Sequence, residues 1–105
     1  MAANAYIGNR GGIPYVAATQ LSEGSASANA VYVLPNHVFR FLGQAGLVVV
    51  YIPTASATTV SGVDLQVNSQ IMPLTSNAGA ALTTLSAGMH LLSFNKQNNT
   101  LNLFV

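Results

Sequence analysis

The sequence contains no cysteine and no tryptophan, and charged residues are scarce in it. The lack of cysteine excludes a disulfide framework, a thiolate metal site and a cysteine nucleophile. The 105 residues include three Lys or Arg and two Asp or Glu, or 5% of the chain, whereas about a quarter of an ordinary soluble domain is charged. A domain of this length exposes many of its residues, so its surface must consist largely of uncharged polar, small and hydrophobic side chains. With a net charge of +1, such a surface favours association with other subunits.

The scarcity of charge also argues against several classes of function. Three basic residues are too few for the phosphate contacts that nucleic-acid binding requires, so we expect no nucleic-acid partner. The two carboxylates, Glu23 and Asp64, and the two histidines, His37 and His90, match no metal-ligand spacing and no acid–base arrangement. Neither a Gly-x-Ser-x-Gly elbow nor a phosphate-binding glycine pattern is present. We therefore predict that the protein is not an enzyme and has no catalytic residues, no metal and no cofactor.

The sequence has no long hydrophobic run. Its longest uninterrupted apolar stretch is Leu47 to Ile52, far shorter than the roughly 20 residues of a spanning helix. Residues 1–10 lack a positively charged region followed by an apolar one, so they do not resemble a signal peptide. We expect no membrane partner and accumulation in the cytoplasm where the chain is made.

From Val31 onward, the sequence predicts one β-strand after another. The segments are apolar or alternate between apolar and polar residues, and Pro, Gly or Asn separates them. These segments are 31–34, 37–42, 47–52, 63–67 and the short 71–72, which ends at Pro73. The segment 47–52 is nearly all β-branched or aromatic, which is typical of a strand covered on both faces. We predict an all-β fold, a compact antiparallel β-sandwich or barrel.

The C-terminal residues predict a β-hairpin. Segments 89–95 and 100–105 flank the polar connection 96–99, whose length is common in hairpins. A terminal strand that contains apolar residues should be paired within a sheet, because otherwise it would fray. The expected core of the whole domain consists of the apolar residues that share one face of each strand: Val48, Val50, Ile52, Val63, Leu65, Val67, Leu101 and Leu103.

Residues 1–30 differ from the rest of the chain in composition. They are rich in Ala, Gly, Ser and Asn, and their large apolar residues follow neither the helical nor the strand period. Such a segment is either an extended arm that becomes ordered on assembly or a disordered tail. We divide the chain into an extended N-terminal arm, residues 1–30, and a β-domain, residues 31–105. The anchor-like residues of the arm are Tyr6, Ile7, Ile13, Tyr15 and Val16.

Aromatic residues of the predicted strand 37–42 are further candidates for contacts. Phe39 and Phe41 share a face with His37, and the opposite face is also partly apolar. We interpret one face as domain core and the other as a subunit interface. A carbohydrate-binding platform is the alternative.

Several features of the chain occur together in one known kind of protein. The chain is short, poor in charge and free of Cys and Trp, with a Gly/Ala/Ser-rich segment from Ala2 to Ala30, a β body from Val31 and the terminal strand Leu101-Asn-Leu-Phe-Val105. In overall design it resembles the small decoration, or cement, proteins of tailed-bacteriophage heads.

The resemblance implies a non-enzymatic structural subunit of the virion, located on the capsid surface. It implies a homo-oligomer, with a trimer favoured, and the major capsid protein or an equivalent assembly subunit as partner. Tyr6, Ile7, Ile13 and Tyr15 would then contact the shell, and Arg10 would be a polar anchor. The alternatives are another self-associating subunit, such as a head-fibre, tail or filament component, and a small sugar- or peptide-binding β-module.

Overall fold

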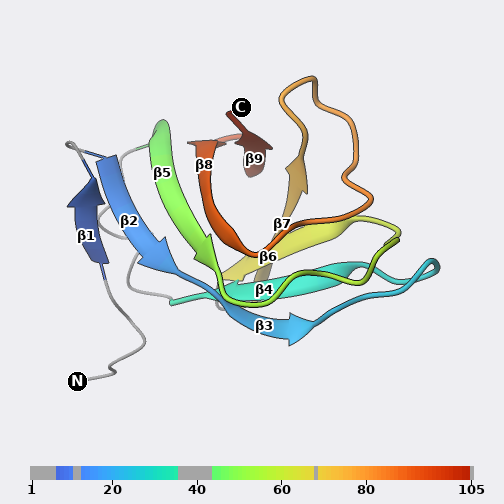
Figure 1. The fold of residues 1–105 in the computed structure, drawn as a ribbon. Helices are drawn as coiled ribbons and strands as arrows, with labels where there is room; N and C mark the ends of the chain where they lie inside the picture. Colours follow the sequence, from blue (N-terminus) through green and yellow to red (C-terminus); the bar gives the residue numbers. More distant parts are fainter. Residues whose placement is uncertain (1–6, 11–12, 36–43, 68, 105) are drawn as a thin grey trace.

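The computed structural model describes residues 7–10, 13–35, 44–67 and 69–104, and this part of the chain is built from β-strands (Figure 1). It contains no helix in these ranges, and so none that is able to cross a membrane. Nine described strands form one sheet. They are β1 (Ile7–Arg10), β2 (Ile13–Ala17), β3 (Thr19–Ser22), β4 (Ala30–Leu34), β5 (Ala45–Ile52), β6 (Val63–Val67), β7 (Gln70–Thr75), β8 (Gly88–Asn95) and β9 (Thr100–Leu103). The predicted all-β fold is confirmed.

The sheet curls into a nearly closed barrel. Its strand order is β1-β2-β5-β8-β9-β7-β6-β4-β3, so β2 and β3 lie near opposite ends of the order. In the sequence, however, only Ala18 separates these two strands. The chain therefore passes directly from pairing with β5 to pairing with β4, and this brings the two ends of the sheet together (Figure 1). The Ala18 amide donates a hydrogen bond of 2.9 Å to the Tyr51 carbonyl at this junction.

The sheet is mixed. Of the pairings among the described strands, five are antiparallel and three are parallel, namely β2–β5, β4–β6 and β7–β9. The predicted C-terminal hairpin is present as β8 and β9, and β9 lies between β8 and β7 in the sheet. The last described strand is thus paired within the sheet, as the sequence predicted, and the structure adds a second neighbour, β7, which the sequence did not predict.

The core lies inside the barrel and contains the residues that alternate along each strand. On β6, Val63, Leu65 and Val67 are buried, whereas Asp64 and Gln66 point outward. Seven of the eight predicted core residues are buried, and Leu103 is partly buried against them.

Residues 13–22 belong to the barrel, which corrects the arm boundary expected at residue 30. Val16 is 1% exposed, Ala18 is 6% exposed and both lie in the core. Sequence periodicity missed these strands because β2 is apolar on both faces and contains Pro14, and because the apolar Leu21 of β3 is 64% exposed. Residues 1–6 and 11–12 lie outside the described residues, as does the strand expected at 37–42.

The strand expected to end at Pro73 continues to Thr75 as β7. Pro73 pairs with Asp64 on β6, and pairing with β9 begins only at Leu74. The missing N–H of a proline is best tolerated at such a boundary, where one neighbouring strand is not yet paired.

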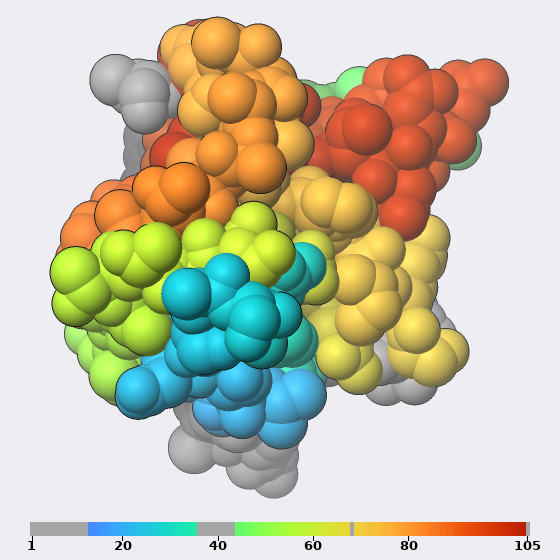
Figure 2. Space-filling model, turned by 90° about the vertical axis from the view of Figure 1, so that its right-hand side faces the viewer, coloured from blue at the N-terminus to red at the C-terminus, as the bar shows by residue number. Residues whose placement is uncertain are grey.

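Three loops close one end of the barrel, and they lie side by side in Figure 2. They comprise residues 23–29, 53–62 and 76–87, drawn in cyan, yellow-green and orange. Backbone hydrogen bonds join them: the Ala57 amide donates to the Glu23 carbonyl at 2.8 Å, and the Val60 amide donates to the Thr83 carbonyl at 2.8 Å. Val60 is 2% exposed and extends the core into this end. The loops are therefore ordered parts of the domain.

Candidate assembly surface

The two faces of β5 have different environments. Val48, Val50 and Ile52 point into the barrel and are at most 1% exposed. Leu47 and Val49 on the other face are half-buried, and Tyr51 is 37% exposed. The sequence predicted a strand covered on both faces. The structure places one face in the core and the other on the outer surface of the barrel.

The outward residues of β5 continue into apolar rows across the neighbouring strands. In one row, Ala17 of β2 pairs with Tyr51, which pairs with Met89 of β8. In the next row, Tyr15 pairs with Val49, which pairs with Leu91. Side chains at paired positions on one face of a sheet lie close enough to touch. The register thus gathers residues that are far apart in the sequence.

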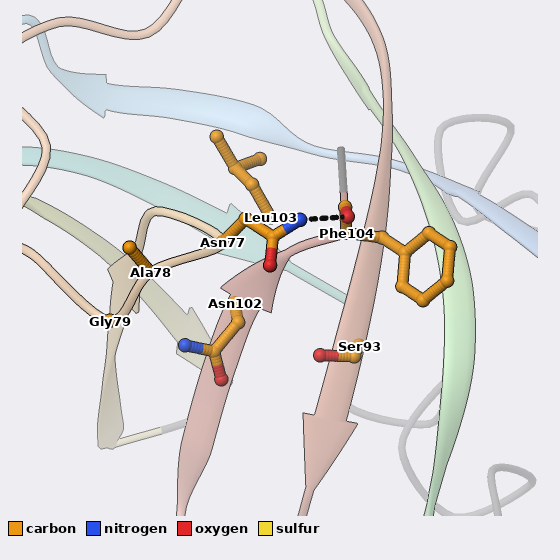
Figure 3. Close-up of a pocket in the computed structure, with 7 residues that line it drawn as sticks. All are labelled: Asn77, Ala78, Gly79, Ser93, Asn102, Leu103 and Phe104. Carbon is orange, nitrogen blue, oxygen red and sulfur yellow. Dashed lines mark hydrogen bonds between the residues drawn. The ribbon is translucent and has the colours of Figure 1, made fainter.

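Phe104 extends these rows beyond the end of β9. Its backbone amide donates a 2.8 Å hydrogen bond to the Leu91 carbonyl, and its ring lies on the β5 side of β8 (Figure 3). Phe104 is 48% exposed and Met89 is 50% exposed. We call this surface the outer apolar face, and it consists of Tyr15, Ala17, Leu47, Val49, Tyr51, Met89, Leu91 and Phe104.

None of these eight residues is charged, and the charged side chains whose placement the structure describes lie elsewhere. Glu23 is in the loop after β3, Asp64 is on β6 and Lys96 is in the β8–β9 turn. The Asp64 carboxylate accepts a 2.9 Å hydrogen bond from Asn29 Nδ2. Covering the eight residues of the outer apolar face would therefore bury none of these three described charges, and burial of unpaired charge is the costly part of forming most interfaces.

The described residues offer little to a metal or to acid–base chemistry. They contain no group of three or more His, Asp or Glu side chains able to hold a metal ion. His90 is half-buried, and its Nε2 lies 2.8 Å from the Ser86 carbonyl oxygen. This contact fixes the ring against the loop that precedes β8. His37 lies outside the described residues.

The candidate contact residues from the sequence are only partly brought together. Tyr6, Phe39 and Phe41 lie outside the described residues. Ile7 and Arg10 belong to β1, which pairs antiparallel with β2, so that Ile7 is opposite Val16 and Arg10 is opposite Ile13. Ile13 and Tyr15 are half-buried on β2, and Tyr15 lies in the outer apolar face.

The contact residues predicted from the sequence do not include the most exposed members of this face, Tyr51, Met89 and Phe104. A signal for Tyr51 was available, because the apolar run 47–52 leaves an apolar second face that must be covered by something. No comparable signal marks Met89, since its place beside Tyr51 depends on the register between β5 and β8. Comparison with protein-family models, curated proteins and solved structures found no match.

Proposed function

We propose that the protein is a non-enzymatic structural subunit that associates with copies of itself and with neighbouring subunits through the outer apolar face. The observation that carries this proposal is the pair of registered apolar rows on the outside of a barrel whose core is already complete. A large exposed apolar patch on a small protein typically marks an interaction surface. The absence of charge from the face favours a partner surface that is also neutral.

The energy available from the face favours an assembly with several contacts per subunit. Full burial of one large apolar side chain is worth about 1.5–3 kcal/mol, so covering the exposed parts of Tyr51, Met89 and Phe104 yields about 2–4 kcal/mol. Association costs about 4–15 kcal/mol in lost freedom of motion. These three side chains alone do not hold two molecules together. Contacts repeated around a closed oligomer or across a shell add up to the stability required.

The particular assembly that we propose is a viral particle. The resemblance in design to phage-head decoration proteins supports it, as does the low charge of the chain. On this proposal the subunit is a homotrimer on the capsid surface, bound to the major capsid protein and made in the host cytoplasm. A head-fibre, tail or filament subunit is the alternative within the same structural class.

Self-association is tested by light scattering after size exclusion and by sedimentation velocity over a range of protein concentrations. We expect the wild type to form an oligomer. The dissociation constant of the oligomer should be at least about tenfold higher for Met89→Lys than for the wild type, since a buried lysine costs more than 1.4 kcal/mol. Ile71→Lys is the matched control, because Ile71 is 44% exposed on β7, outside the outer apolar face. A wild-type protein that is monomeric at every concentration would refute the proposal.

The viral assignment is tested separately, on particles purified by density gradient from the culture that produces the protein. We expect the protein to band with the particles in a fixed ratio to the major capsid protein. An oligomer in solution that is missing from such particles would overturn the viral assignment but leave the structural class standing. Filaments in negative-stain images would favour the alternative.

A further inference from the structure

A depression lies beside the outer apolar face, between β8, β9 and the turn that follows β7 (Figure 3). It has a volume of about 520 Å³. Ser93 on β8 and Asn102 on β9 are directly paired across its floor. The complete lining is Asn77, Ala78, Gly79, Ser93, Asn102, Leu103 and Phe104, and none of these residues is charged.

The two amide side chains of this depression are held in place by the protein. Asn77 Nδ2 donates to the Phe104 carbonyl at 2.6 Å, as the dashed line in Figure 3 shows. Asn102 Nδ2 donates to Thr75 Oγ1 and, at 3.5 Å, to the Ser76 carbonyl. Each amide nitrogen is thus used to fix the side chain, while the amide oxygen is left to accept a hydrogen bond from outside. Within the described structure, the Ser93 hydroxyl has no hydrogen-bond partner.

A second, smaller depression adjoins the first and shares Gly79 and Asn102 with it. Its other lining residues are Pro73, Thr75, Asn99, Thr100 and Leu101, which are again uncharged. Together the two adjoining depressions present both polar and apolar atoms and extend across β8, β9 and β7. Two adjoining depressions suit a ligand with repeated units, each carrying polar groups and an apolar face, better than a single small molecule.

We propose that this surface binds a neutral oligosaccharide. Sugar hydroxyls are good donors to amide oxygens and pair well with serine and threonine hydroxyls. Phe104 also lines the depression, and its ring lies across β8 from Asn102, on the β5 side, where it offers an apolar plane for the C–H face of a sugar unit that extends over β8 (Figure 3). A charged ligand is disfavoured because no lining residue carries the opposite charge. An apolar ligand would leave the amide oxygens and the Ser93 hydroxyl without partners.

The test is a titration of the ¹⁵N-labelled full chain, followed by amide chemical shifts. The probes are cellohexaose, maltohexaose and chitohexaose, with inorganic phosphate as the charged comparison. We expect at least one oligosaccharide to bind with a dissociation constant of about 0.1–10 mM, which is usual for an open, shallow site. The shifts should map to Gly79, Ser93 and Asn102. No localised shift from any of the three sugars at about 20 mM would overturn the proposal.

Two variants assign the binding to this surface. Ser93→Ala should weaken binding about five- to tenfold, because it removes one hydrogen bond. The matched control is Ser69→Ala, an exposed serine in the β6–β7 turn, which should bind as the wild type does. Phe104→Ala should weaken binding about tenfold, and Leu21→Ala, an exposed apolar residue on β3, should not. Equal binding by Ser93→Ala and Ser69→Ala would overturn the assignment.

The result is separable from the proposed structural role. Met89→Lys should weaken self-association and leave the sugar-induced shifts in place, because Met89 does not line either depression. If the same amides shift with protein concentration alone and no sugar affects them, a second copy occupies the surface and the saccharide proposal is wrong.

Discussion

Tyr32 lies at the point where the barrel closes, and its hydroxyl group provides a direct test of that closure. Tyr32, on β4, is 0% exposed, and its hydroxyl donates a 2.7 Å hydrogen bond to the Thr54 carbonyl. It also accepts from Gln20 Nε2 on β3 at 3.2 Å. Gln20 Nε2 in turn is 3.3 Å from the Thr54 carbonyl and 3.0 Å from the Ala55 carbonyl. The cluster joins β3, β4 and the segment after β5.

Replacing Tyr32 by Phe removes the hydroxyl and keeps the ring that fills the core. One net hydrogen bond is worth about 0.5–1.5 kcal/mol. The Thr54 carbonyl keeps Gln20 as a donor and Gln20 keeps the Ala55 carbonyl, so no group is left with the larger penalty of a buried polar atom without a partner. We therefore expect Tyr32→Phe to lower the free energy of unfolding by about 1 kcal/mol, which corresponds to a fall in Tm of about 4–8 °C in a domain of this size.

Urea unfolding followed by circular dichroism measures this loss. Tyr51→Phe is the matched control, since it makes the same chemical change at an exposed position of β5 and should leave stability unchanged. A loss for Tyr32→Phe no larger than for Tyr51→Phe would refute the claim that the hydroxyl fastens the barrel. A loss above about 3 kcal/mol would show instead that the Thr54 carbonyl does not keep its second donor.

Burial raises the pKa of Tyr32, an effect that the hydrogen bond from Gln20 only partly offsets. The neutral Tyr32 hydroxyl therefore stabilises the fold fully at a pH below its unfolded pKa of about 10. This stabilisation is lost as the pH rises through the folded pKa. Urea unfolding at rising alkaline pH should show the wild type losing stability relative to Tyr32→Phe, and parallel curves would contradict this. Gly24→Ala should lower the free energy of unfolding by about 2–5 kcal/mol, and Gly79→Ala by about 1–2 kcal/mol, as measured by thermal melts. Both glycines have a positive φ, but of the two only Gly24 has no room for a Cβ, which would lie 2.7 Å from the Ala30 amide nitrogen. Deleting residues 2–18 should abolish cooperative melting, since it removes β2 with Val16 and uncovers β5; a truncated chain that melts cooperatively within a few degrees of the wild type would show that these strands are dispensable.

The parts of the fold that the sequence predicted are those with local signals. The alternation in Val63–Val67 shows which side of β6 faces the core, and a polar turn between two apolar segments shows the β8–β9 hairpin. Both depend on residues that are close in the chain. The burial of Leu65 and Leu101 follows from the same local pattern.

The parts that the sequence did not predict depend on contacts between distant segments. β2 is recognisable as a strand only through its parallel pairing with β5, about 30 residues further along the chain. The sequence of β3 shows almost no pattern of buried apolar residues. Its Leu21 points to solvent, and its polar Gln20 forms hydrogen bonds where the barrel closes. Reading residues 1–30 as an arm follows from this lack of periodicity.

The candidate contact residues divide in the same way. Tyr15 was predicted from the sequence as an aromatic anchor in a segment without periodicity, and it lies in the outer apolar face. Met89 and Phe104 join that face through the β5–β8 register and through the hydrogen bond from Phe104 to Leu91. Asn77 reaches Asn102 and Ser93 only because the turn after β7 folds back over β9. No spacing along the chain encodes that approach.

The outer apolar face and the depression lined by Asn77, Ser93 and Asn102 share Phe104, and this shared residue links the two proposals. A partner that covered the ring completely would remove the plane on which a sugar packs, whereas a partner that stopped at Leu91 would leave it open. Any effect of assembly on saccharide affinity must be matched by an equal effect of the saccharide on assembly, because the two binding free energies are thermodynamically coupled. Ser93 lines the depression and Met89 belongs to the face, so their variants perturb one event each. Phe104 is the residue whose substitution changes both, and the sign of the coupling reveals where the partner surface ends.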